Sequence, residues 1–130
     1  MEITNATARA GADAGSVICS WTFKPMARPE ISVTLDSSLM ASPLAARQAI
    51  LMARLPENHR GKTVEPLPKL ADDGLSRATV ENGVTKLYEI EAVKGRRHFL
   101  LTVRPRDGGD VSYRTAGAAI NFLGSGISGL

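Results

Sequence analysis

The feature that most constrains this chain is a run from residue 78 to residue 104, in which three extended segments are separated by two short turns. Asn82-Gly83 and Lys94-Gly95 occupy the turns. Asn-Gly between extended segments is the strongest short-range signal for a β-hairpin, because both residues accept the positive φ angles that such a turn needs. The run therefore predicts a three-stranded antiparallel meander over residues 78–81, 84–93 and 97–104.

Alternation along this meander predicts which side chains are buried. On the middle strand, apolar residues alternate with Glu89 and Glu91, and successive side chains of a strand point to opposite faces. We therefore expect Glu89 and Glu91 to point to solvent or to a neighbouring strand. The expected core residues of the last two strands are Tyr88, Ile90, Ala92, Phe99, Leu101 and Val103.

Two more strands are predicted near the start of the chain. Residues 17–24 alternate between apolar and mostly polar side chains, and residues 31–36 repeat the pattern. A period of two with β-branched and aromatic residues is typical of a strand with one buried face. Pro25 and Pro29 lie between the two segments, so we expect an antiparallel pair joined by a short loop.

A first helix is predicted between Ser42-Pro43 and Pro56. Serine is a preferred N-cap residue, and proline is well tolerated at the first helical position. Residues three and four apart share a helix face. The expected apolar face, interrupted by one polar residue, consists of Leu44, Gln48, Leu51, Met52 and Leu55, with Ile50 close by.

A second helix is predicted from Asp110, as the N-cap, to about Leu123. Gly124 is well placed as a C-cap glycine, because glycine adopts the left-handed conformation that often ends a helix. The expected apolar side of this helix consists of Val111, Thr115, Ala118, Ala119, Phe122 and Leu123.

These elements predict an α+β fold with the order β-β-α-β-β-β-α. We expect a mostly antiparallel sheet of about five strands, with both helices packed on one face. Residues 16–124 are expected to form a single domain. Residues 1–15 are expected to be a flexible arm or a truncated first element, and residues 125–130 a flexible tail. A chain of 130 residues with 43% hydrophobic side chains is long enough to bury a core of its own.

Candidate reactive residues do not converge in the sequence. Cys19, the one cysteine, is expected in the apolar core, where a thiol is inert. His59 and His98 have no second His or Cys at the spacing of zinc ligands, so each is expected to be solvated or to cap a turn. Asp72-Asp73-Gly74 is expected to be a plain turn, because further EF-hand ligands do not follow it. The sequence predicts a non-catalytic domain without a metal or cofactor.

Positive charge is the one uneven feature of the chain, whose formal net charge is +3. Basic residues crowd the predicted hairpin tip at 94–98 and recur at the far end of the same strand. Such charge either protects a sheet edge as a solvated hairpin or binds an acidic partner. The predicted partner-binding residues are Lys94, Arg96, Arg97, His98, Arg104 and Arg106.

Three functions stay open at this point. The leading hypothesis is an interaction domain that holds a protein partner through a sheet face or the basic hairpin, and a homo-oligomer is compatible with it. A binder of nucleic acid or an anionic surface is the alternative, although nucleic acid is disfavoured because the aromatic residues are expected in the core. The third is a small-molecule binder or enzyme with a pocket near residues 57–77. No apolar run reaches about 18 residues, so no transmembrane segment is expected.

Three short segments resemble the small PsbP-like domains of bacterial envelope proteins and lipoproteins. These are residues 16–21, with their Cys-x-Trp strand, the turn at 70–75, and the alanine-rich helix at 116–123. The resemblance implies a non-enzymatic domain with a binding or assembly role. It also implies a location in the periplasm or cell envelope, whereas the single cysteine is equally compatible with the cytoplasm.

Overall fold

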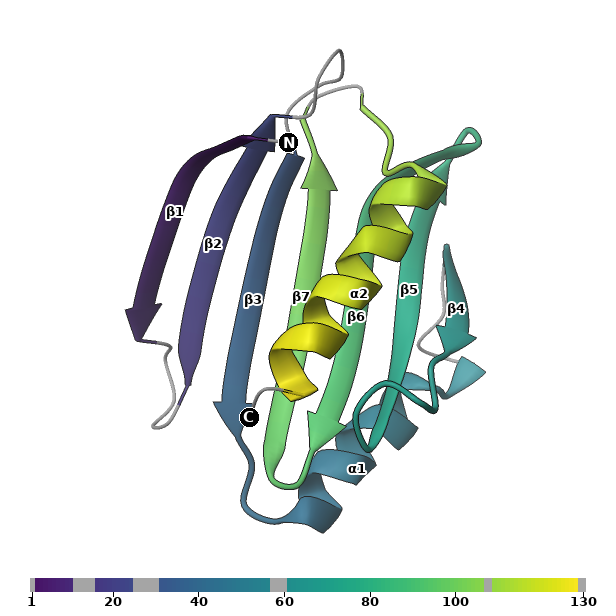
Figure 1. Cartoon of the computed structure of the whole chain (residues 1–130). Coiled ribbons are helices and arrows are strands. Elements are labelled where there is room, and N and C mark those ends of the chain that lie inside the picture. Colours follow the sequence, from purple (N-terminus) through teal and green to yellow (C-terminus); the bar gives the residue numbers. More distant parts are fainter. Residues whose placement is uncertain (1, 11–15, 25–30, 57–60, 107–108, 129–130) are drawn as a thin grey trace.

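The computed structural model describes residues 2–10, 16–24, 31–56, 61–106 and 109–128. The described chain forms a seven-stranded antiparallel sheet in the order β1-β2-β3-β7-β6-β5-β4, together with two helices (Figure 1). The elements are β1 Glu2–Ala10, β2 Val17–Lys24, β3 Ile31–Leu39, α1 Pro43–Ala53, β4 Lys62–Pro66, β5 Asp73–Glu81, β6 Val84–Lys94, β7 Arg97–Pro105 and α2 Tyr113–Ser128.

The predicted α+β class and its antiparallel strands are confirmed. The β2–β3 pair and the β5–β6–β7 meander form as expected, and Asn82 and Gly83 have φ angles of 53° and 75° in the first turn of the meander. Two strands exceed the expected number. β4 lies in a segment rich in proline, and β1 lies in the expected arm, where pairing with β2 satisfies backbone groups that a loose arm leaves to water.

The register of the sheet assigns side chains to its two faces. Val103 of β7 is opposite Val33 of β3 on one side and Tyr88 of β6 on the other, so these three side chains share one face. Helix α2 packs on this face. The buried core there comprises Ile31, Val33, Leu70, Tyr88, Ile90, Ala92, Phe99, Leu101, Val103, Val111, Leu123 and Ile127.

Helix α1 packs on the opposite face, which corrects the expectation that both helices share one. Val93 follows Ala92 on β6 and therefore points the other way, and it packs with Leu75 of β5 against Ala46 and Ile50 of α1. Figure 1 shows α2 in front of the sheet and α1 passing behind β5 and β6. The chain leaves β3 at the end of the sheet, where it can turn towards either face. The position of α1 therefore depends on which apolar side chains of the sheet it can pack against.

The face of α1 that packs on the sheet also differs from the prediction. The start is as expected, because Ser42 Oγ accepts a hydrogen bond of 3.0 Å from the N–H of Ala45. The predicted apolar face, however, points to solvent: Leu44 is 65%, Leu51 56% and Met52 58% exposed. The buried residues of α1 are Ala46 and Ile50. The small side chain of Ala46 lets the helix approach the sheet closely, and Ile50 fills the space beside it.

Helix α2 is shifted towards the C-terminus of its predicted range. Ser112, not Asp110, caps its start, since Ser112 Oγ accepts from the N–H of Thr115 at 3.1 Å. Asp110 instead accepts a bond of 2.6 Å from the N–H of Thr85. The helix does not end at Gly124 but continues to Ser128, which makes residues 125–128 helical rather than a tail. Burying Ile127 against the sheet gives this last turn its tertiary support.

Candidate functional site

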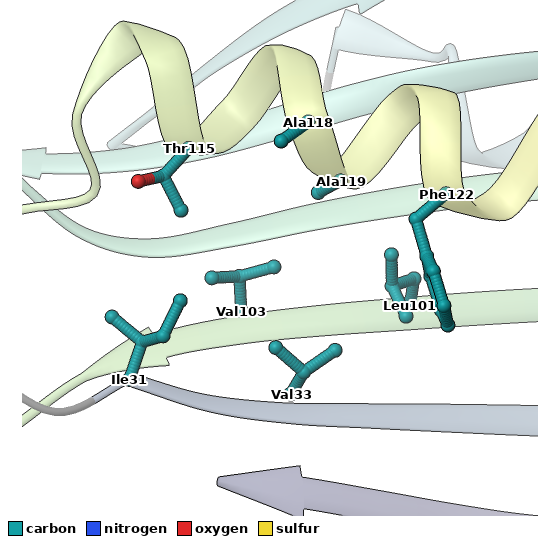
Figure 2. A pocket seen from close by; sticks show the side chains of 8 residues that line it. All are labelled: Ile31, Val33, Leu101, Val103, Thr115, Ala118, Ala119 and Phe122. Atoms are coloured by element: carbon teal, nitrogen blue, oxygen red, sulfur yellow. The ribbon is translucent and has the colours of Figure 1, made fainter. Parts of the chain in front are cut away.

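An apolar hollow lies between α2 and the strands β3 and β7. Its volume is about 230 Å³, and it is lined by Ile31, Val33, Leu101, Val103, Thr115, Ala118, Ala119 and Phe122. Thr115 supplies the polar group among these side chains, and its hydroxyl already bonds to Ser112 Oγ at 2.9 Å. Figure 2 shows the short side chains of Ala118 and Ala119 above the aliphatic side chains of the strands. The hollow exists because these alanines do not fill the space that α2 covers.

Phe122 is shared by this hollow and a second one. The second hollow has a volume of about 240 Å³ and is lined by Leu35, Ser37, Arg97, Phe99, Phe122, Leu123, Gly126 and Ile127. The Phe122 ring meets Trp21 of β2 edge to face, with ring centroids 5.6 Å apart. Phe122 is nevertheless 49% exposed. We call the two hollows and this aromatic pair the α2 cleft.

The second hollow ends at positive charge. Arg97, at the start of β7, lines it and is exposed. Lys94 lies close by, because its Nζ donates to the carbonyl of Ile127 at 3.4 Å. Within the described residues no carboxylate pairs with Arg97. The α2 cleft therefore combines an apolar body with a cationic end.

The sequence predicted that Trp21 and Phe122 belong to the core, and it did not predict the cleft. The signal that could have predicted the cleft was the pair Ala118-Ala119. These alanines lie three and four residues from both Thr115 and Phe122, so all four residues share one face of the helix. Small side chains at that spacing leave room when the facing strands carry only branched aliphatic residues.

A third hollow lies on the other side of α2, and its lining includes part of the segment predicted to form a pocket. Its volume is about 310 Å³, and Thr63, Glu65 and Ser76 line it together with Tyr88 and Asp110. Burial raises the pKa of the Tyr88 phenol, although its hydrogen bond to Ser76 acts in the opposite direction. The carboxylates of Glu65 and Asp110 make this hollow acidic. Residues 57–60 of the predicted segment lie outside the described residues.

The opposite face of the sheet carries a cluster of charged side chains beside α1. Arg77 forms ion pairs with Glu91 and, at 3.3 Å, with Glu89. Lys62 Nζ lies 3.3 Å from Glu89 Oε1, and His98 Nε2 lies 2.9 Å from Glu91 Oε2. We call Lys62, Arg77, Glu89, Glu91 and His98 the ion-pair cluster. Glu89 and Glu91 do point to strand neighbours, but they are largely buried instead of solvated.

The cluster changes the protonation equilibria of its members. Burial by itself raises the pKa of Glu91, but the hydrogen bonds and positive charge of His98 and Arg77 outweigh it, so the pKa lies below its ordinary value. Burial likewise opposes the charge of Arg77, and the two carboxylates reverse the effect and raise its pKa. The native fold thus favours the charged forms of both groups.

The predicted partner-binding residues do not form one surface. Lys94, Arg96 and Arg97 lie at one end of β7, and Arg104 and Arg106 at the other, where they border a shallow hollow of about 180 Å³. Arg97 and Pro105 are the first and last residues of β7. At the usual rise per residue of a strand, the distance between them is about 27 Å. His98 points to the face opposite the α2 cleft and pairs with Glu91, so it is not the solvated residue expected.

The candidate reactive residues are also kept apart. Cys19 lies on the α2 face of the sheet, opposite Leu35, and is only partly buried. His98 lies on the other face, and His59 is outside the described residues. In the part of the chain that the structure describes, no three His, Cys, Asp or Glu residues are grouped so that they could hold a metal ion.

In comparisons with known proteins, no family model, no curated protein and no solved structure matches the chain. The resemblance to PsbP-like domains, and the location that it implies, therefore stay predictions. Among the described residues, neither helix is long and apolar enough to cross a membrane.

Proposed function

We propose that this chain is a non-catalytic binding domain, whose α2 cleft holds the hydrocarbon chain of an anionic amphiphile such as a medium-chain fatty acid. The observation that carries the proposal is that two apolar hollows share Phe122 and that Arg97 lines the outer end of one of them.

The chemistry of the lining supports this class of ligand. Ligand sites are typically concave and mostly apolar, with a few polar groups that orient the ligand. A hydrocarbon chain beside Val33, Val103 and Ala119 leaves no polar group of its own unsatisfied, whereas a sugar or nucleotide would lose hydrogen bonds to water there. Arg97 offers a planar guanidinium that matches the geometry of a carboxylate.

The aromatic pair supports an entry route between the two hollows. Phe122 is half exposed and is held on one side by Trp21. Side chains at exposed positions change rotamer on a nanosecond scale. A rotation of Phe122 would join the hollows into one elongated site without any movement of the backbone.

The protein contains one tryptophan, Trp21, and this makes the test direct. We expect 11-bromoundecanoate to quench Trp21 emission in a saturable manner, because bromine quenches indole only at close range. The uncharged bromo-alcohol of the same length should bind more weakly, and a cationic alkylammonium more weakly still. Saturation that is equal for all three head groups would contradict a role for Arg97.

Matched variants separate the cleft from the surface. Ala118→Leu should reduce the affinity at least tenfold, because it fills the first hollow, whereas Asn121→Leu adds the same side chain to an exposed position of α2 that lines neither hollow. Arg97→Gln should weaken binding about threefold, as expected for an exposed ion pair, and Arg104→Gln should leave it unchanged. Equal quenching in Ala118→Leu and wild type would refute the proposed site.

A further inference from the structure

We infer that the outer face of α1, together with the β6–β7 hairpin tip, docks on the surface of an anionic lipid bilayer. This surface lies apart from the α2 cleft and has its own evidence, so it does not rest on the proposed function.

The first observation is the exposed apolar ridge of α1. Leu44, Leu51 and Met52 of α1 are all exposed, and their spacing of seven and eight residues places them on one side of the helix. Leu55, two residues after the end of α1, is also exposed. Soluble proteins seldom expose several large apolar side chains side by side, and such patches mark interaction sites.

The second observation is the charge around this ridge. Residues 37–56 contain no acidic residue but include Arg47 and Arg54. Arg54 is bound to Asp73, whereas Arg47 is exposed on the flank of the ridge. An apolar helix face that is bordered by arginine, on a helix without carboxylates of its own, is typical of helices that lie in the interface of anionic membranes.

The hairpin tip brings more positive charge to the same end of the molecule. The N–H of Met40 donates to the carbonyl of Arg96 at 2.7 Å, and Arg96 Nε donates to the carbonyl of Met40 at 3.0 Å. These bonds hold the tip beside the chain that enters α1, and Figure 1 shows both at one end of the sheet. Arg96 is exposed there. Arg96 and the ridge therefore lie at the same end of the sheet.

The geometry favours a bilayer over two other partners. A second copy would bind through a two-fold interface that sets the same patch against itself, and this would bring together two patches that both carry the positive charge of Arg47 and Arg96. A peptide helix requires a groove, yet no residue of α1 lines any of the four hollows described above. A convex apolar ridge bordered by positive charge is complementary to the surface of an anionic bilayer, which can deform around the ridge.

Flotation with lipid vesicles tests the inference. We expect the wild-type protein to float with vesicles of phosphatidylcholine and phosphatidylglycerol in equal parts at low salt, and not with phosphatidylcholine alone. The double variant Arg47→Gln/Arg96→Gln should lower the partition coefficient by about thirtyfold, at roughly a factor of five per arginine. Leu51→Gln/Met52→Gln should lower it at least tenfold while leaving the net charge unchanged.

The control variant is Val80→Gln/Tyr113→Gln, which removes two exposed apolar side chains far from α1 in the sequence and should float like wild type. Ala118→Leu should also float, because it blocks only the α2 cleft. Circular dichroism establishes that each variant is folded. Wild type that fails to float with anionic vesicles would overturn the inference, and so would Leu51→Gln/Met52→Gln that floats as well as wild type. Loss of flotation in Ala118→Leu would assign the binding to the cleft and equally overturn it.

Discussion

Beneath α2 the sheet presents mainly aliphatic side chains, whereas the same strands place the ion-pair cluster on the opposite face, beside α1. Apolar packing tolerates a poor fit, since it does not depend on direction, and on the α2 face it leaves the hollows of the cleft. Ion pairs depend on particular partners, so the contacts of Arg77 with Glu89 and Glu91 form only in one register of β5 against β6. One face of the sheet therefore contains space that side chains leave unfilled, and the other face fixes the alignment of the strands.

The largest effect should come from the apolar face. Ile90 is fully buried beneath α2, and Ile90→Ala should lower the free energy of unfolding by about 3 kcal/mol, because it removes buried methyl groups and leaves a cavity. Urea denaturation followed by circular dichroism measures it. If Ile90→Ala lowers the free energy of unfolding by less than Glu91→Gln does, the apolar face contributes less to stability than the charged face, contrary to this prediction.

A somewhat smaller effect is expected from the charged face. Glu91→Gln keeps the size of the side chain but leaves Arg77 and His98 without their shared carboxylate, so stability should fall by about 2 kcal/mol. Glu81→Gln, at an exposed position of β5, is the matched control and should change stability by less than about 0.5 kcal/mol. Equal stabilities of the two variants would mean that water screens the cluster completely.

Acidification should weaken the charged face, through Glu91 in particular. The pKa of Glu91 is lower in the folded state than in the unfolded chain, so protons bind preferentially to the unfolded chain as the pH falls. The stabilisation is therefore present above the ordinary carboxyl pKa and is lost as the pH falls below it, towards the native pKa. Urea midpoints measured from pH 7 to pH 3 should decline less steeply in Glu91→Gln than in wild type. Parallel pH curves would assign the acid sensitivity to other carboxylates.

The smallest effect should arise at the aromatic pair of the cleft. Phe122→Ala removes the edge-to-face contact with Trp21, and since Phe122 is half exposed the cost should be about 1 kcal/mol. Trp21 emission should shift to the red as water reaches the indole ring. Asn121→Ala, the adjacent exposed position, should leave the emission unchanged. An unaltered emission spectrum in Phe122→Ala would show that the pair does not shield Trp21 in solution.

Much of the fold could be predicted because local signals were strong. Asn82-Gly83, the alternation around Ile90 and the cap at Ser42 each act within a few residues, and each was correct. The candidate site could not be predicted in the same way. Phe122 belongs to the apolar side of α2 in the sequence, but whether it fills the core or borders a cleft depends on how far α2 lies from β3.

The amino-acid sequence by itself determined the antiparallel meander, the β2–β3 pair and the existence of both helices, because turns, caps and alternation are set by neighbouring residues. Only the tertiary structure decided that α1 and α2 lie on opposite faces and that Leu51 and Met52 point to solvent. It also decided that β1 joins the sheet as an edge strand. The physical reason is that burial is a property of pairs of surfaces: a small residue such as Ala46 can be buried in place of a leucine when it lets two elements approach more closely.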